Sequence, residues 1–136
     1  MSRETLCGPA EARRRARMAR SYLDVAEQAD LAESDEGRNV AAGNAVLAAI
    51  AAADALCCLR LGRHARGQSH QEATTLLRTI RPDGSTLAKD LATVLGVKDA
   101  AHYGTVFVSR TVLRSTLRAA MRLVTAAESA IANIGA

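Results

Sequence analysis

The segment that decides the fold is AAGNAVLAAIAAADALCCLRL, residues 41–61, in which few polar residues interrupt a long apolar run. A helix that is apolar on nearly all sides must be buried, so this segment predicts the central helix of a bundle. Asp54 lies within it. Because a buried carboxylate needs a partner, we expect Lys98, His102 or Tyr103 to satisfy Asp54, with Asp54, Lys98 and Tyr103 forming a buried polar cluster.

The composition predicts one all-α domain. The chain has 136 residues, a length typical of a single domain. It is 49% hydrophobic but only 2% aromatic, so the core must consist of Ala, Leu, Val and Ile, which suits close packing of helices. We therefore expect an up-and-down bundle of four or five helices over residues 9–136, preceded by a flexible arm over residues 1–8.

The cysteines and the apolar run bear on location. Cys7, Cys57 and Cys58 form neither an even disulfide framework nor a metal-binding spacing, which favours a reducing compartment. Segment 41–61 is long enough to span a bilayer. It is mostly alanine and contains Asp54 and Arg60, however, so we expect a core helix and no membrane association. These features predict a cytoplasmic protein without metal or cofactor.

Helical spacing and capping residues outline the individual elements. We expect helices over 9–33, about 38–61, 70–80, 85–95 and 97–103, and a last helix that follows an N-cap at Ser109. Ser69 and Glu72 predict a capping box at the start of the third helix. Two apolar seams have four-three spacing. The first-helix seam is Met18, Tyr22, Val25, Ala29 and Ala32; the last-helix seam, internal or between subunits, is Leu113, Leu117, Ala120, Val124, Ala127, Ile131 and Ile134.

Arginines dominate the charge, since the chain carries 18 Lys and Arg against 14 Asp and Glu. Those at successive i+4 positions of the last helix form what we call the arginine ridge: Arg110, Arg114, Arg118 and Arg122. Phosphates would be suitable ligands for the ridge, for Arg66 and for the cluster Arg13–Arg20. The alternative is a solvated face that pairs with the acidic half of the first helix. With so few aromatic residues, a platform that stacks bases is not expected.

The histidines are the candidates for acid–base chemistry. His70 and His102 lie near cations, His70 seven residues after Arg63 and His102 four residues after Lys98. A structural or surface role is the alternative for each. No metal-ligand set, Gly-rich phosphate loop or Ser/His/Asp set occurs at a useful spacing.

Three segments together resemble the small stand-alone HEPN proteins of actinobacteria. They are AAIAAADA at 48–55, GRHARGQSHQEA at 62–73 and LGVKDAAHYG at 95–104, and the resemblance extends over about residues 22–127. It implies a helical bundle that commonly dimerises, in a superfamily of RNA-cleaving toxins, nucleotidyltransferase-linked relatives and non-catalytic members. A nucleic-acid- or nucleotide-binding accessory module of a toxin–antitoxin or defence system is the leading hypothesis.

The ribonuclease branch of this superfamily carries an R-x4–6-H motif, in which Arg stabilises the phosphate and His transfers protons. Here Lys98 and His102 stand at the late position, one residue too close and with Lys in place of Arg. Arg63 and His70 have the R-x6-H spacing but fall after the central helix. A metal-independent endoribonuclease that uses these residues is the second hypothesis, and a structural protein-interaction bundle is the third.

Overall fold

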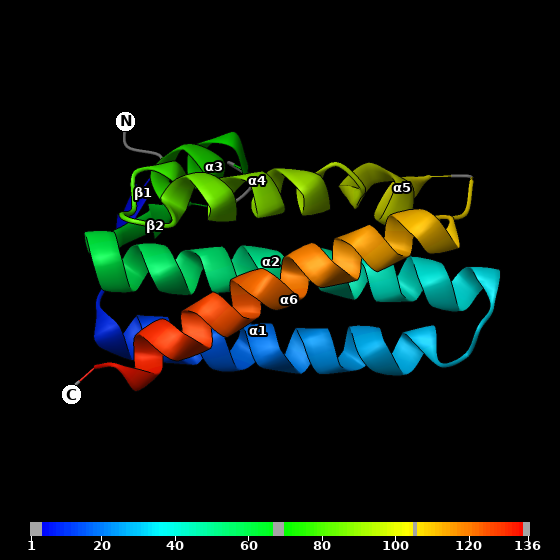
Figure 1. Ribbon diagram of the computed structural model, residues 1–136, viewed down its shortest axis with the longest axis horizontal. Helices are drawn as coiled ribbons and strands as arrows, with labels where there is room; N and C mark the ends of the chain where they lie inside the picture. Colours follow the sequence, from blue (N-terminus) through cyan, green and yellow to red (C-terminus); the bar gives the residue numbers. More distant parts are fainter. Residues whose placement is uncertain (1–3, 67–69, 105, 135–136) are drawn as a thin grey trace.

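The computed structural model describes residues 4–66, 70–104 and 106–134, and these are predominantly helical (Figure 1). The all-α prediction is therefore confirmed, with the addition of a short two-stranded ribbon. The elements are β1 (Glu4–Leu6), α1 (Pro9–Asp30), α2 (Asp35–Leu61), β2 (Arg63–Ala65), α3 (His70–Arg78), α4 (Gly84–Leu95), α5 (Lys98–Tyr103) and α6 (Arg110–Ala132).

Helix α2 forms the centre of the bundle, as predicted. In Figure 1 it runs between α1 on one side and the row α3, α4 and α5 on the other, and α6 crosses it diagonally. The Ser34 hydroxyl caps its start by accepting a hydrogen bond from the N–H of Gly37. Gly62 ends it in the left-handed region at φ 74°, which favours glycine. By length and composition α2 could span a membrane, but 72% of its most apolar 18-residue stretch is buried inside the protein.

Helix α1 begins at Pro9 as expected and ends at Asp30, three residues earlier than predicted. The predicted first-helix seam is wrong, because the Met18 and Val25 side chains are exposed. The buried face lies beside it and consists of Ala12, Ala16, Ala19, Leu23 and Ala26. Small side chains on this face let α1 approach the alanines of α2 closely, which outweighs the greater hydrophobicity of Met and Val.

The shorter helices follow the sequence pattern. Each of α3 and α4 buries one apolar face, as Leu77 and Leu91 illustrate. Ser109 caps α6, also as predicted. The last-helix seam proves to be internal, because α6 packs on α2, α4 and α1, and Val124 and its neighbours on the seam are fully buried. The predicted capping box includes Ser69, which lies outside the described residues.

The N-terminal segment differs from the loose arm that we expected. Residues 4–6 pair antiparallel with β2, so that Thr5 lies opposite His64. Cys7 follows, and it forms a disulfide with Cys58 of α2. The expectation that the cysteines stay unpaired is thus wrong for two of the three, because the ribbon brings residues 51 positions apart together. Cys57 remains a buried thiol.

Candidate functional site

The arginine ridge begins at a helix end that a side chain caps. The Ser109 hydroxyl accepts a hydrogen bond from the N–H of Val112 at 3.1 Å. Val108, before the cap, and Leu113, one turn into α6, are buried in the same apolar cluster, which fixes the start of the helix. With Leu113 turned inward, Arg110 and Arg114 are directed to the surface.

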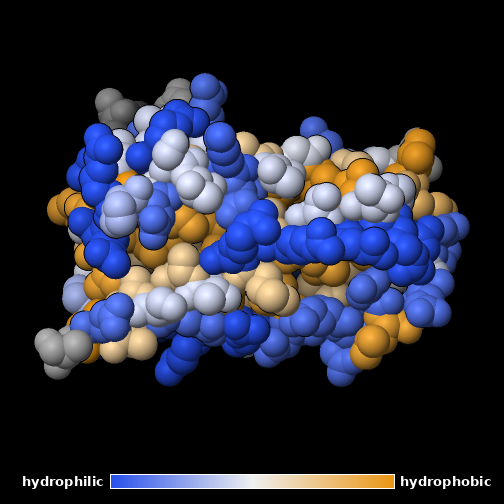
Figure 2. All heavy atoms as spheres, viewed as in Figure 1, coloured by the Kyte–Doolittle hydropathy of each residue, from blue (hydrophilic) through white to orange (hydrophobic). Residues whose placement is uncertain are grey.

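Three of the four ridge arginines have no partner in the described part of the chain. Arg110, Arg114 and Arg118, which we call the ridge trio, are exposed and make no hydrogen bond or ion pair with another described residue. Arg110 and Arg118 lie eight positions apart on α6, or about 12 Å along its axis. Figure 2 shows a continuous hydrophilic band along this half of α6, with apolar atoms beside it. The trio thus forms a row of solvated positive charges on a rigid helix.

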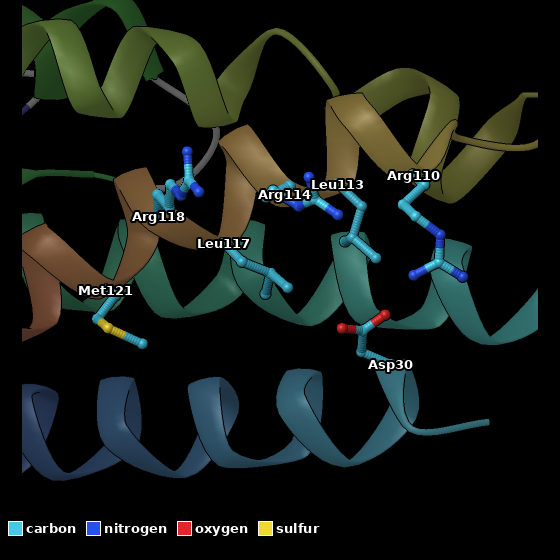
Figure 3. A pocket seen from close by; sticks show the side chains of 7 residues that line it. All are labelled: Asp30, Arg110, Leu113, Arg114, Leu117, Arg118 and Met121. Atoms are coloured by element: carbon cyan, nitrogen blue, oxygen red, sulfur yellow. The ribbon is translucent and has the colours of Figure 1, made fainter. Parts of the chain in front are cut away.

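A shallow groove lies beside the ridge trio, between α6 and the end of α1 (Figure 3). Its volume is about 190 Å³. Leu117 and Met121 supply an apolar floor, while Asp30 rises from α1 toward α6 on the side of Arg110. The groove therefore combines several cations, one carboxylate and an apolar surface. This arrangement suits an elongated anion that carries its own apolar parts.

The fourth ridge arginine, Arg122, is engaged within the protein. Its guanidinium donates to both carboxylate oxygens of Asp90, through Nη2 at 2.7 Å and Nε at 3.1 and 3.2 Å. Asp90 is buried on α4, and its hydrogen bond raises the pKa of Arg122 further. Arg122 therefore links α6 to α4, and for this reason it does not belong to the ridge trio.

The α1 arginines form a cluster that is mostly neutralised. Arg15 pairs with Asp54 of α2, and Arg20 forms a two-pronged ion pair with Glu128 of α6 at 2.7 and 2.9 Å. This contact raises the pKa of Arg20 and lowers that of Glu128. Neighbouring helices thus offset the charges that the dipole of α1 disfavours. Most of this cluster is structural, although Arg13 and Arg17 stay exposed without a described partner.

Asp54 is buried, as predicted, but its partners are different. Arg15 Nη2 lies 3.0 Å from Asp54 Oδ2, and His64 Nδ1 lies 3.8 Å from Oδ1. Burial raises the pKa of Asp54, while the charges of Arg15 and His64 oppose that effect. Sequence reasoning missed both partners. Arg15 could have been found, because it adjoins the buried face of α1, but His64 depends on the path of the ribbon.

The predicted cluster of Asp54, Lys98 and Tyr103 is contradicted by the position of α5. This helix packs on the first half of α2, where the ring of His102 lies against Gly43. Gly43 precedes Asp54 by eleven residues, or about 16 Å along α2. The Tyr103 side chain is 77% exposed, so it is no part of a buried cluster. Lys98 instead lies close enough to His70 for its charge to act on that ring.

The Asp54 pair yields a stability prediction. Arg15→Met leaves a buried carboxylate without its cation, so we expect a loss of about 2 kcal/mol in the free energy of unfolding at pH 7. Asp54→Asn removes the charge itself and should cost less. A pKa raised on folding means stability that is present at low pH and lost as pH rises through the folded-state pKa. The penalty of Arg15→Met should therefore shrink toward pH 4. Urea unfolding at both pH values measures it, and a pH-independent penalty would contradict this assignment.

The Arg63 and His70 pair does not have the geometry of a catalytic dyad. Arg63 Nε lies 2.6 Å from a carboxylate oxygen of Glu4 on β1, so its charge is neutralised within the ribbon. His70 Nε2 is buried without a hydrogen-bond partner. Burial, together with the charge of Lys98, lowers the pKa of His70. These surroundings favour a neutral imidazole that packs at the start of α3.

The lowered pKa of His70 predicts a pH effect. A histidine whose pKa falls on folding contributes stability above its ordinary pKa of 6.5, and that stability is lost as pH decreases through the folded value. We therefore expect His70→Gln to reduce the stability that the protein loses between pH 7.5 and pH 5. Urea unfolding of wild type, His70→Gln and the exposed control His102→Gln measures this. An equal loss in all three would refute the effect.

Lys98 and His102 share α5 at i,i+4 spacing, as predicted. Both His102 and Tyr103 are exposed, with ring centroids 6.0 Å apart. Arg66 is exposed after β2 and has no described partner. None of these residues lines the groove beside the ridge trio.

The groove beside the ridge trio is lined by residues of α1 and α6. Among the candidates from the sequence, Arg110, Arg114 and Arg118 come together at one surface, whereas the histidines are dispersed over other elements. No known protein-family model matches the chain, and no curated protein matches it.

Proposed function

We propose that this chain is a HEPN-like helical-bundle protein that binds RNA through the phosphate groups of its backbone. The observation that carries the proposal is the ridge trio: three exposed guanidinium groups on one helix, without described partners. Elsewhere, Arg15, Arg20 and Arg122 are neutralised by carboxylates of neighbouring helices. Guanidinium groups bind phosphate oxygens in pairs, which makes phosphate the preferred counterpart.

The chemistry of the surface favours recognition without base specificity. Steps of four residues place successive trio side chains about 6 Å apart along the axis. The chain contains one Phe, two Tyr and no Trp, so it offers little for base stacking. Leu117 and Met121 provide apolar surface for ribose or base edges. Most of the affinity should then come from phosphate contacts and depend on salt.

A ribonuclease activity has less support than RNA binding. The R-x6-H pair would need a cation directed at substrate and a histidine nitrogen within reach of it. Arg63 is paired with Glu4, and His70 Nε2 is buried. We therefore propose an accessory, non-catalytic role in the cytoplasm, within a toxin–antitoxin or defence system, where a nucleotidyltransferase or another protein would be the partner.

A homodimer is part of the same proposal. Its support is the HEPN resemblance and the exposed apolar side chains at i,i+7 spacing on two adjacent helices: Met18 and Val25 on α1, Val40 and Leu47 on α2. We expect sedimentation equilibrium to give a dimer mass for the wild type. Leu47→Glu should shift the equilibrium toward monomer, because it buries a charge in the interface. A monomeric wild type at all concentrations would contradict this part.

The proposal is tested by competition. A fluorescently labelled single-stranded RNA is titrated with wild-type protein and followed by anisotropy, and unlabelled RNA or an acidic peptide of equal charge is then added. We expect RNA to displace the probe far more effectively than the peptide. The acidic peptide is also labelled and titrated directly; if it binds and RNA does not, the ridge is a protein-interaction surface. If neither binds, it is a solvated face.

A further inference from the structure

The end of α2 distant from the ridge trio carries a second group of chemically distinctive side chains. Sγ of Cys7, Sγ of Cys58 and a ring nitrogen of His64 all lie within 4.8 Å of one another. Cys7 directly follows β1, Cys58 lies in the last turn of α2, and His64 lies in β2. Cys58 is buried and the other two are half-buried, so the group is shielded but reachable.

The ribbon holds these residues together independently of the disulfide. The N–H of Cys7 donates to the carbonyl of Gly62 at 3.0 Å. Residues 4–6 pair with 63–65, and the ion pair of Glu4 with Arg63 adds a side-chain contact across the strands. When the disulfide is reduced, the two sulfurs can separate while their backbones stay in register.

The surroundings of His64 suit a metal ligand. Its Nδ1–H donates to the carbonyl of Ala65 at 2.7 Å, and the Asp54 carboxylate lies 3.8 Å from the same nitrogen. The neutral ring then carries its lone pair on Nε2. Metal-binding histidines characteristically donate their other ring N–H to a carbonyl or carboxylate in this manner.

We propose that the reduced protein binds Zn²⁺ through Cys7, Cys58 and His64. Two thiolates and an imidazole are a characteristic zinc donor set, with water in the fourth position of a tetrahedron. Zinc bonds of about 2.0–2.3 Å place the ligand atoms less than 4 Å apart, so the His64 nitrogen must approach the sulfurs by up to about 1 Å, while the two sulfurs move apart once their bond is reduced. Zn²⁺ would then replace the disulfide as the link between the ribbon and α2.

Replacing the disulfide with zinc requires a reductant, and a dithiol can supply the electrons and protons. Two electrons and two protons from the dithiol convert the disulfide to two thiols, and the dithiol becomes a disulfide itself. Zn²⁺ then displaces the two thiol protons to solvent. Thiols are kept reduced in the cytoplasm, so the zinc form belongs to that compartment and the disulfide to an oxidising one. This inference is independent of RNA binding, because it concerns a different end of the molecule.

Cobalt provides the test, because Co²⁺ replaces Zn²⁺ and absorbs light. Full-length protein is reduced, freed of reductant without air and titrated with Co²⁺. We expect thiolate-to-cobalt charge-transfer absorption at one equivalent, which Zn²⁺ abolishes. Oxidised wild type, whose fold is intact, should give none. No thiolate absorption from the reduced wild type overturns the proposal.

Variants assign the ligands. Cys7→Ser and Cys58→Ser should lose the charge-transfer band, and His64→Gln should lose most of the Zn²⁺ affinity, because it removes one of the three protein ligands. Cys57→Ser is the matched control: it removes a neighbouring thiol that does not belong to the group, so its band should stay. Circular dichroism verifies that each variant is folded. Loss of the band in Cys57→Ser, or its retention in Cys7→Ser, contradicts the assigned ligands.

Discussion

Replacing Arg110, Arg114 and Arg118 together with glutamine is expected to weaken the binding of single-stranded RNA on the order of a hundredfold at low salt. Glutamine keeps the length and helix propensity of the side chain but removes its charge. None of the three has a described partner within the protein, so the fold should be unaffected. Anisotropy with a labelled RNA measures the affinity, and thermal unfolding verifies stability.

The matched control for this variant removes the same charge elsewhere. Arg60, Arg78 and Arg81 are also exposed, and none of them lines the groove beside the ridge trio. Their triple replacement by glutamine lowers the net charge from +4 to +1, as the ridge variant does. We expect the control to lose only a few-fold in affinity. If both variants lose affinity equally, net charge rather than the ridge trio attracts RNA.

Cys7→Ser is expected to destabilise the oxidised protein more strongly than Arg15→Met does. The disulfide joins residues 51 positions apart, and closing a loop of that length restricts the unfolded chain by about 4 kcal/mol in the entropic description. For a domain of this size we expect the melting temperature of the oxidised protein to fall by roughly 15 °C. Thermal unfolding of oxidised wild type and Cys7→Ser measures the difference.

Reducing conditions provide the control for this effect. With reductant and a chelator present, wild type and Cys7→Ser should have nearly the same stability, since neither contains a disulfide or bound metal. Cys57, which takes no part in the disulfide, is unreactive because burial raises the pKa of its thiol to about 12. Equal stability of the two proteins without reductant would show that the disulfide does not form.

The sequence predicted those parts of the fold that depend on local patterns. Ser109 caps its helix and Gly62 ends another because capping depends on one residue and its immediate neighbours. The predicted buried face of α1 is wrong, since it rests on the rule that larger apolar side chains are better core residues than alanines. Which face of α1 is buried depends on α2, because the small alanine side chains of α2 pack well only against a helix that approaches closely.

For the candidate site, the sequence likewise predicted the features that depend on local spacing and missed those that depend on other elements. The i+4 spacing of the arginines establishes the ridge, but whether each one is paired depends on other helices: Arg122 meets Asp90, and the trio does not meet a described carboxylate. The partners of Asp54 and the meeting of Cys7 with Cys58 depend on the ribbon. Residues 4–6 and 63–65 gave no strand signal, because each strand is only three residues long.

The most direct test of the central claim is the salt dependence of RNA binding by wild type and the ridge variant. Each phosphate neutralised on a single strand contributes about −0.7 to the slope of log K against log salt. If the ridge trio contacts phosphates, replacing it with glutamine should make the slope shallower by about 2, whereas the Arg60, Arg78 and Arg81 control should keep the wild-type slope. Identical slopes for wild type and the ridge variant would contradict the account, because the trio would then make no phosphate contacts.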